Sequence, residues 1–117
     1  HKFKLVGQRT SNQVIEHYLQ SDIVLIASNS ESQSLVALEA MASSTPVIYA
    51  PLPAVYSIVG KAGIQVEKSP EAFCHAITEL SLNRSELSNM GKDGHLLAKQ
   101  YTWQDTITKL NIVYLEL

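Results

Sequence analysis

Short apolar runs alternate along the chain with segments in which apolar residues recur every three or four positions. The run 23–26, Ile-Val-Leu-Ile, is uninterrupted, which is typical of a strand buried on both faces of a parallel sheet. Val14, Ile15 and Tyr18 instead recur at helical spacing. The pattern predicts strands at residues 3–6, 22–27, 45–50 and 64–66, and helices at about 12–19, 33–42, 55–59, 70–80, 85–99 and from 103 onward.

Short strands that alternate with helices predict an α/β fold, in which a Rossmann-like parallel sheet is flanked by helices. Two helix starts carry local signals. Ser69-Pro-Glu supplies an N-cap serine, a proline and an acid in the first turn, and Thr102 to Asp105 resembles a capping box. The residues expected to face the core are Leu35, Leu38, Met41 and Ala42, then Phe73, Ile77 and Leu80, then Leu87, Met90, Gly94 and Leu97, and finally Ile107, Leu110 and Tyr114.

The polar loop 28–34 follows the second strand and leads into a helix, where open parallel sheets bind their ligands. Its serines leave the backbone uncovered, and a helix amino terminus offers unpaired N–H donors and partial positive charge to a phosphate. The carboxylates of Glu31 and Glu39 suit a different partner, the hydroxyl groups of a ribose or a hexose. Phosphate donors beside hydroxyl acceptors indicate a nucleotide sugar.

Each glutamate also has a simpler interpretation. Ser28 and Glu31 have the spacing of a capping box, so they could serve only to start the helix. Glu39 lies about 7 Å along the helix, roughly the distance from a diphosphate to its ribose, and helical side chains lean toward the amino terminus. The alternative for Glu39 is a solvated acid on the outer edge of the helix.

The bulk properties are those of one ordinary soluble domain, with 117 residues, 45% of them hydrophobic. A net charge of -2 without a basic stripe argues against a nucleic-acid partner. No apolar run is long enough to span a bilayer and no signal peptide is visible, so we expect a cytoplasmic protein. The single cysteine, Cys74, fits a reducing compartment and is expected to be buried and inert.

No metal site is expected. His17, His75 and His95 fall on separate predicted helices, without acids or cysteines at the spacing of metal ligands. They are interpreted as histidines on helix surfaces.

The block at residues 31–48, Glu-Ser-x-Ser-Leu-Val-Ala-Leu-Glu-Ala-Met-Ala-Ser-x-Thr-Pro-Val-Ile, closely resembles the signature of the family 4 (group 1) retaining glycosyltransferases. The resemblance extends from residues 5–7 to residues 101–103, nearly the whole chain. It implies the GT-B fold, with residues 1–117 as the nucleotide-sugar-binding carboxy-terminal domain, truncated at its amino-terminal side. The implied substrates are a nucleotide-diphosphate sugar, with no further cofactor, and an acceptor (a sugar, lipid or small molecule) that the missing amino-terminal domain binds.

The resemblance also assigns roles to individual residues. It implies that Glu31 contacts hydroxyls of the transferred sugar and stabilises the reacting centre, and that Glu39 binds the ribose. It places the backbone amides of Ser34 and Leu35, with Ser32 beside them, at the distal phosphate. It places the segment from Gly7 to Arg9 near the base, although Arg9 could also be a solvated loop charge.

The chain departs from the family pattern at Ser44, where glycine is usual, and at residues 51–55, where the family has a glycine-rich loop. Basic residues that meet the diphosphate belong to an earlier part of the domain. We therefore expect the chain alone to bind donor weakly and to transfer nothing. Two alternatives stay open: a nucleotide-sugar epimerase, and a non-catalytic GT-B-like domain that serves as a partner or regulator.

Two further expectations concern the surroundings of the chain. The missing strands would leave an open sheet edge, which favours a homodimer of the chain. The full-length protein could work at the inner surface of the membrane.

Overall fold

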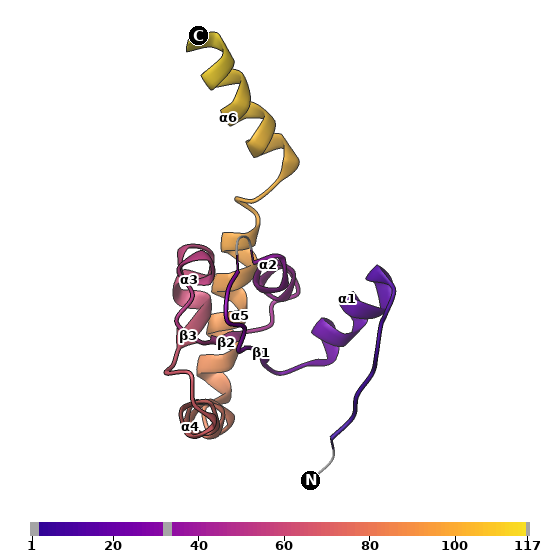
Figure 1. Cartoon of the computed structure of the whole chain (residues 1–117), viewed down its shortest axis with the longest axis vertical. Helices are drawn as coiled ribbons and strands as arrows, with labels where there is room; N and C mark the ends of the chain where they lie inside the picture. Colours follow the sequence, from indigo (N-terminus) through magenta and orange to yellow (C-terminus); the bar gives the residue numbers. More distant parts are fainter. Residues whose placement is uncertain (1–2, 32–33, 117) are drawn as a thin grey trace.

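A sheet of three parallel strands forms the centre of the computed structural model, which describes residues 3–31 and 34–116 (Figure 1). The strands are β1 (Val24–Ile26), β2 (Val47–Tyr49) and β3 (Gly63–Gln65), side by side in that order. Because they are parallel, the loops after all three strands leave from the same edge of the sheet. The predicted α/β class with a parallel sheet is confirmed.

Helices precede, connect and follow the strands. They are α1 (Ser11–Gln20), α2 (Leu35–Ala42), α3 (Pro53–Val59), the single 3-10 turn η1 (Gly60–Ala62), α4 (Pro70–Ser81), α5 (Arg84–Ala98) and α6 (Trp103–Glu116). Five of them begin after a polar side chain that accepts a backbone N–H of the first turn, which satisfies one otherwise unpaired donor. These capping residues are Thr10, Ser34, Ser69, Asn83 and Thr102. The helix start predicted at Ser69 is confirmed.

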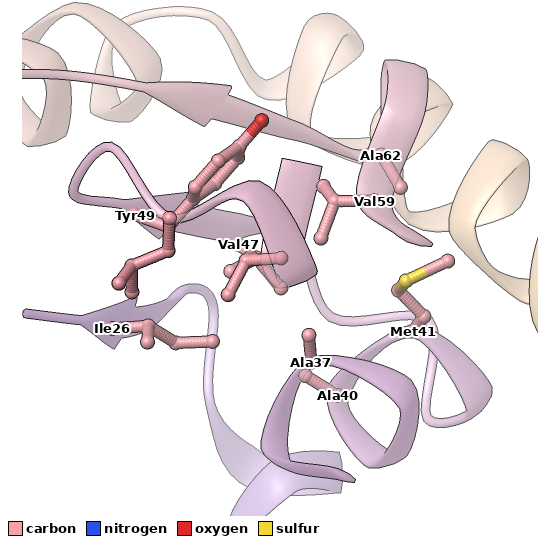
Figure 2. Packing of buried hydrophobic residues seen from close by; sticks show 10 residues of the cluster. Ile26, Ala37, Ala40, Met41, Val47, Tyr49, Val59 and Ala62 are labelled. Carbon is pink, nitrogen blue, oxygen red and sulfur yellow. The ribbon is translucent and has the colours of Figure 1, made fainter. Parts of the chain in front are cut away.

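The larger of two apolar clusters lies between one face of the sheet and helices α2 and α3. Figure 2 shows Ala37 and Ala40 of α2 facing Val47 of β2, and all three side chains are fully buried. Small alanines let the helix approach the sheet closely, so that α2 is fixed over β1 and β2. The buried residues of this cluster are Ile26, Ala37, Ala40, Met41, Val47, Tyr49, Leu52, Val55, Val59 and Ala62.

The second cluster lies on the opposite face, because successive side chains of a strand alternate between faces. Ile48 points into it from the middle of β2 and meets α4 and the first half of α5. The last turn of α5 packs against the first cluster through Leu97 and Ala98. Helix α5 therefore contacts both clusters and joins the two layers. The buried residues of the second cluster are Ile48, Ala76, Leu80, Leu87 and Met90.

Gly91 lets α5 approach the end of α2 at backbone distance, because a Cβ placed on it would lie 2.3 Å from the carbonyl oxygen of Ser44. A Cβ on Gly94 would lie 3.0 Å from the Cβ of Ala62 on η1. Ser44 follows α2 in the left-handed conformation, with a φ of 58°. From α5, His95 donates a hydrogen bond from Nδ1 to the last carbonyl of α2, that of Ala42, at 2.9 Å. These contacts fix the carboxyl end of α2 against α5.

Two predictions about strands are wrong. Residues 3–6 form no strand, and Phe3 and Leu5 are each 84% exposed. A strand needs a neighbouring backbone for its hydrogen bonds, which an apolar alternation cannot supply by itself. Leu25 in β1 was expected to be buried but is 49% exposed, because β1 lies at the edge of the sheet beyond the cover of α4. In the described residues β1 pairs with β2 alone, and a homodimer through its other edge stays a prediction.

Several helix faces also differ from the predicted ones. In α2 the buried residues are Ala37, Ala40 and Met41, whereas Leu35 is 62% exposed and Ala42 is also exposed. Every residue of this helix except Glu39 is apolar, so its pattern does not identify the inner face. Cys74 was expected to be buried, but it is exposed on α4, whose buried residues are Ala76 and Leu80.

Helix α6 extends away from the sheet, as Figure 1 shows. Its predicted inward residues Ile107, Leu110 and Tyr114 are therefore exposed, by 48%, 50% and 71%. None of the helices that the structure describes has the length and apolar character needed to cross a membrane.

We predict that Gly91→Ala destabilises the fold by about 2 kcal/mol, because the new methyl group would overlap the Ser44 carbonyl oxygen. That oxygen belongs to the backbone and cannot rotate away as a side chain could. Urea unfolding followed by circular dichroism measures the change in the free energy of unfolding.

The matched variant is Ser44→Gly on the other side of the same contact. Glycine adopts a positive φ without the steric cost that serine bears, so this change should stabilise the fold by about 0.5–1 kcal/mol. Equal effects of the two substitutions would contradict the proposed close approach.

Candidate functional site

The amino terminus of α2 faces the edge of the sheet at which the strands end. Ser34 is buried, and its Oγ accepts the N–H of Ala37 at 3.3 Å while its carbonyl accepts the N–H of Leu38 at 3.1 Å. The N–H groups of Leu35 and Val36 donate to no other described residue. Two donors and the positive end of the helix dipole are thus available to an anion at this point.

Glu31 is half-buried in the loop before α2. The Ser28 hydroxyl donates to Glu31 Oε1 at 3.0 Å, and in the described part of the chain no group donates to Oε2. The capping-box interpretation of this pair is wrong, because the helix begins at Leu35 and its cap is Ser34. The pair instead orients a carboxylate within the loop, with one oxygen available to a ligand.

Glu39 is the fifth residue of α2, and it is exposed. The next residue, Ala40, is fully buried, so Glu39 stands at the border between the core and solvent. Its position one and a half turns from Ser34 is the one predicted from the sequence. Both carboxylates therefore lie near the amino-terminal half of one helix.

Tyr18 of α1 is a neighbour of Glu39 that sequence reasoning missed. Burial raises the pKa of Tyr18 to about 12, with a further contribution from the negative charge of Glu39. The backbone of Tyr18 is fixed as well, since the Thr45 hydroxyl donates to its carbonyl at 2.9 Å. The periodicity of α1 identified Tyr18 only as an apolar position, and no sequence signal pairs it with Glu39.

Lys68 is the second residue that the sequence did not reveal. It follows β3 and donates from Nζ to the carbonyl of Ser28, at 3.5 Å, and to Oδ1 of Asn29. The ammonium group thus contacts the loop that carries Glu31, although 40 positions separate Lys68 from Ser28.

Other predicted site residues lie apart from this edge or outside the described residues. Gly7, with a φ of 66°, and Arg9 are exposed in the extended segment before α1, which runs outside the compact part of the chain (Figure 1). No described hydrogen bond joins either of them to the loop. Ser32 lies outside the described residues. The roles of Gly7, Arg9 and Ser32 stay predictions.

One of the two departures from the family pattern serves packing. Leu52 and Val55 are buried in the first cluster, and Pro53 is the first residue of α3. At the other departure the side chain of Ser44 is exposed, and its backbone keeps the left-handed conformation that glycine adopts readily.

His17, His75 and His95 are exposed on α1, α4 and α5, as predicted. Within the described ranges, no group of three histidine, cysteine, aspartate or glutamate residues could hold a metal ion.

Comparison with known proteins identifies the family. Residues 1–83 match the family described as glycosyl transferases group 1, and the chain belongs to that family. It is 32% identical over 116 residues to the D-inositol 3-phosphate glycosyltransferase of Corynebacterium glutamicum (strain R), which covers 97% of the chain. It is 36% identical over 101 residues, 85% of the chain, to the protein of the same name from Geodermatophilus obscurus.

The fold has a close counterpart among solved structures. Sucrose-phosphate synthase from Thermosynechococcus elongatus superimposes with a TM-score of 0.85 over 95% of the chain, at 24% sequence identity. This likeness confirms the predicted GT-B type of fold. The chain spans 28% of the length of the Corynebacterium glutamicum relative, 22% of the Geodermatophilus obscurus relative and 29% of the sucrose-phosphate synthase chain.

We predict that the free energy of unfolding falls as the pH rises from 10 toward 12, and that Tyr18→Phe reduces this fall. The neutral phenol is favoured in the folded state. In the unfolded chain Tyr18 ionises at about pH 10, whereas in the folded chain it does so only at about 12. Urea unfolding at several pH values measures the difference between the two proteins.

Tyr101→Phe is the control, because Tyr101 is half exposed and lies outside both clusters. Identical pH dependence in the wild type and Tyr18→Phe would refute the raised pKa of Tyr18.

Proposed function

We propose that the chain is the donor-binding part of a retaining glycosyltransferase, which moves a sugar from a nucleotide-diphosphate sugar to an acceptor. The observation that carries this proposal is the arrangement around α2. Two backbone N–H groups that donate to no other described residue lie at the helix start, with one carboxylate in the preceding loop and another on the helix itself. A phosphate accepts hydrogen bonds from such N–H groups, and the hydroxyls of a sugar and a ribose donate to carboxylates.

Each group has a separate part in this proposal. The amides near Ser34 and Leu35 bind the distal phosphate and stabilise the negative charge that grows on the leaving nucleoside diphosphate. Glu39 accepts hydrogen bonds from the ribose hydroxyls, with Tyr18 supporting its carboxylate. Glu31 accepts hydrogen bonds from the transferred sugar and stabilises positive charge at its reacting carbon. No step in this scheme requires a metal ion.

The family and the partial coverage of its members support a further proposal about the whole protein. The chain would be the carboxy-terminal, donor-binding domain, and a domain outside it would bind the acceptor. Catalysis depends on holding the two substrates together. The chain alone would accordingly bind donor weakly and transfer no sugar, which a comparison with the full-length protein can test.

We predict that Glu39→Ala weakens the binding of UDP or GDP by about 10- to 100-fold, because hydrogen bonds to the ribose from a charged group are lost. Titration of the chain with each nucleotide, followed by amide NMR shifts, measures the affinity even when it is only millimolar. In the wild type the shifts should centre on the loop before α2 and on α2 itself.

Glu79→Ala is the matched control, since Glu79 is an exposed glutamate of α4, which covers the opposite face of the sheet. Equal losses in the two variants would exclude Glu39 as the ribose ligand. If neither nucleotide shifts any wild-type resonance, the chain and then the full-length protein must be tested with donor sugars before binding is rejected.

For Glu31→Gln we predict a different result. This variant should bind UDP and GDP as the wild type does, because Glu31 contacts the sugar and not the nucleotide. In the full-length protein its rate of sugar transfer should fall by about 100-fold or more. Donor turnover with product analysis measures this rate. An unchanged rate would remove Glu31 from the reacting centre.

The same assay separates the two rival functions. An epimerase would convert the donor into its epimer without transferring it, and a non-catalytic domain would leave it intact. Leu52 and Val55 serve packing, and Ser44 keeps a backbone conformation that glycine would adopt, so neither departure favours a loss of activity. Transfer therefore remains the function that the site supports best.

A further inference from the structure

Lys68 lies at the carboxyl end of the sheet, on a strand connection that the family signature does not include. It stands between β3 and Ser69, the cap of α4. The loop 27–34 leaves the sheet from the same edge, after β1. The Lys68 side chain therefore extends past the end of β2 and contacts Ser28 and Asn29 in the loop after β1.

The contact is made to two neutral oxygens. Lys68 Nζ donates to the Ser28 carbonyl at 3.5 Å and to the side-chain oxygen of Asn29. The ion pair found in the described residues joins Arg84 to Asp22 and leaves Lys68 out. The ammonium group of Lys68 can donate three hydrogen bonds, and among the described residues it is paired with these oxygens and with no carboxylate.

Ser28 links this contact to the reacting centre. Its carbonyl accepts from Lys68, and its hydroxyl donates to Glu31 Oε1 at 3.0 Å. The loop has no regular secondary structure at these residues, so few other contacts define its path. The position of the Glu31 carboxylate thus depends on a connected series of hydrogen bonds that begins at Lys68.

We propose that Lys68 is a positioning residue of the donor site, which fixes the turn at Ser28 and Asn29 and thereby orients Glu31 toward the transferred sugar. This inference rests on the proposed function. Lys68 acts through Ser28, and the nucleotide itself is bound elsewhere, at Glu39 and the start of α2. Loss of Lys68 should accordingly slow the chemical step and leave nucleotide affinity unchanged.

The test uses the full-length protein with UDP-glucose and GDP-mannose as probe donors. Release of UDP or GDP with water as acceptor measures turnover when the natural acceptor is unidentified; water adds to the sugar carbon and the nucleoside diphosphate leaves. Lys68→Met keeps the length of the side chain but removes its donors. We expect kcat to fall about tenfold, as for a small misplacement of a reacting group, with the Kd for UDP or GDP changed by less than about twofold.

Two further variants and one spectroscopic readout sharpen the test. Lys68→Arg retains donors for both oxygens and should restore most of the rate. Lys61→Met is the control, because Lys61 is an exposed lysine on η1, before β3 and so at the opposite edge of the sheet. Without any donor present, the side-chain NH₂ resonances of Asn29 should move in Lys68→Met and stay in place in Lys61→Met.

The outcomes separate the inference from the function on which it rests. If the wild type turns over a donor and Lys68→Met does so equally fast, the inference is wrong and the proposed function stands. A loss of nucleotide affinity equal to the loss of rate would also overturn it, since Lys68 would then bind the nucleotide directly. If the wild type neither binds nor turns over any donor, both fail together.

Discussion

The close contact between α5 and the end of α2 is the constraint on which the rest of the structure depends. Backbone meets backbone at Gly91 and Ser44, and His95 binds the last carbonyl of α2. Because α5 also touches both apolar clusters, this contact joins the two faces of a sheet that has only short strands. These contacts fix the carboxyl end of α2, and its amino terminus stays available to a ligand.

The site combines one rigid half and one half with fewer contacts. Glu39 and Ser34 belong to a helix that is packed on the sheet, whereas Glu31 belongs to a loop held by Ser28 and Lys68. Under the proposed function, the nucleotide would be bound by the helix and the transferred sugar would meet the loop.

Features that depend on neighbouring residues were predictable from the sequence, and features that depend on distant ones were not. Ser69 was identified as a cap because its partner, Ala72, is three residues away. The signature around Glu31 and Glu39 predicted a group 1 glycosyltransferase, which the comparisons confirm, but the neighbours Tyr18 and Lys68 come from elsewhere in the chain. The strand expected at 3–6 failed for the same reason, since strands need partners that composition does not reveal.

The contact between Gly91 and Ser44 has a consequence for how this domain can change in evolution. Position 44 contributes only its carbonyl oxygen, so glycine, serine or asparagine can occupy it and keep the same backbone. Position 91 must lack a side chain, because any Cβ there would overlap the Ser44 carbonyl oxygen. Substitutions at this interface are therefore expected at position 44 only, whereas position 91 must remain glycine.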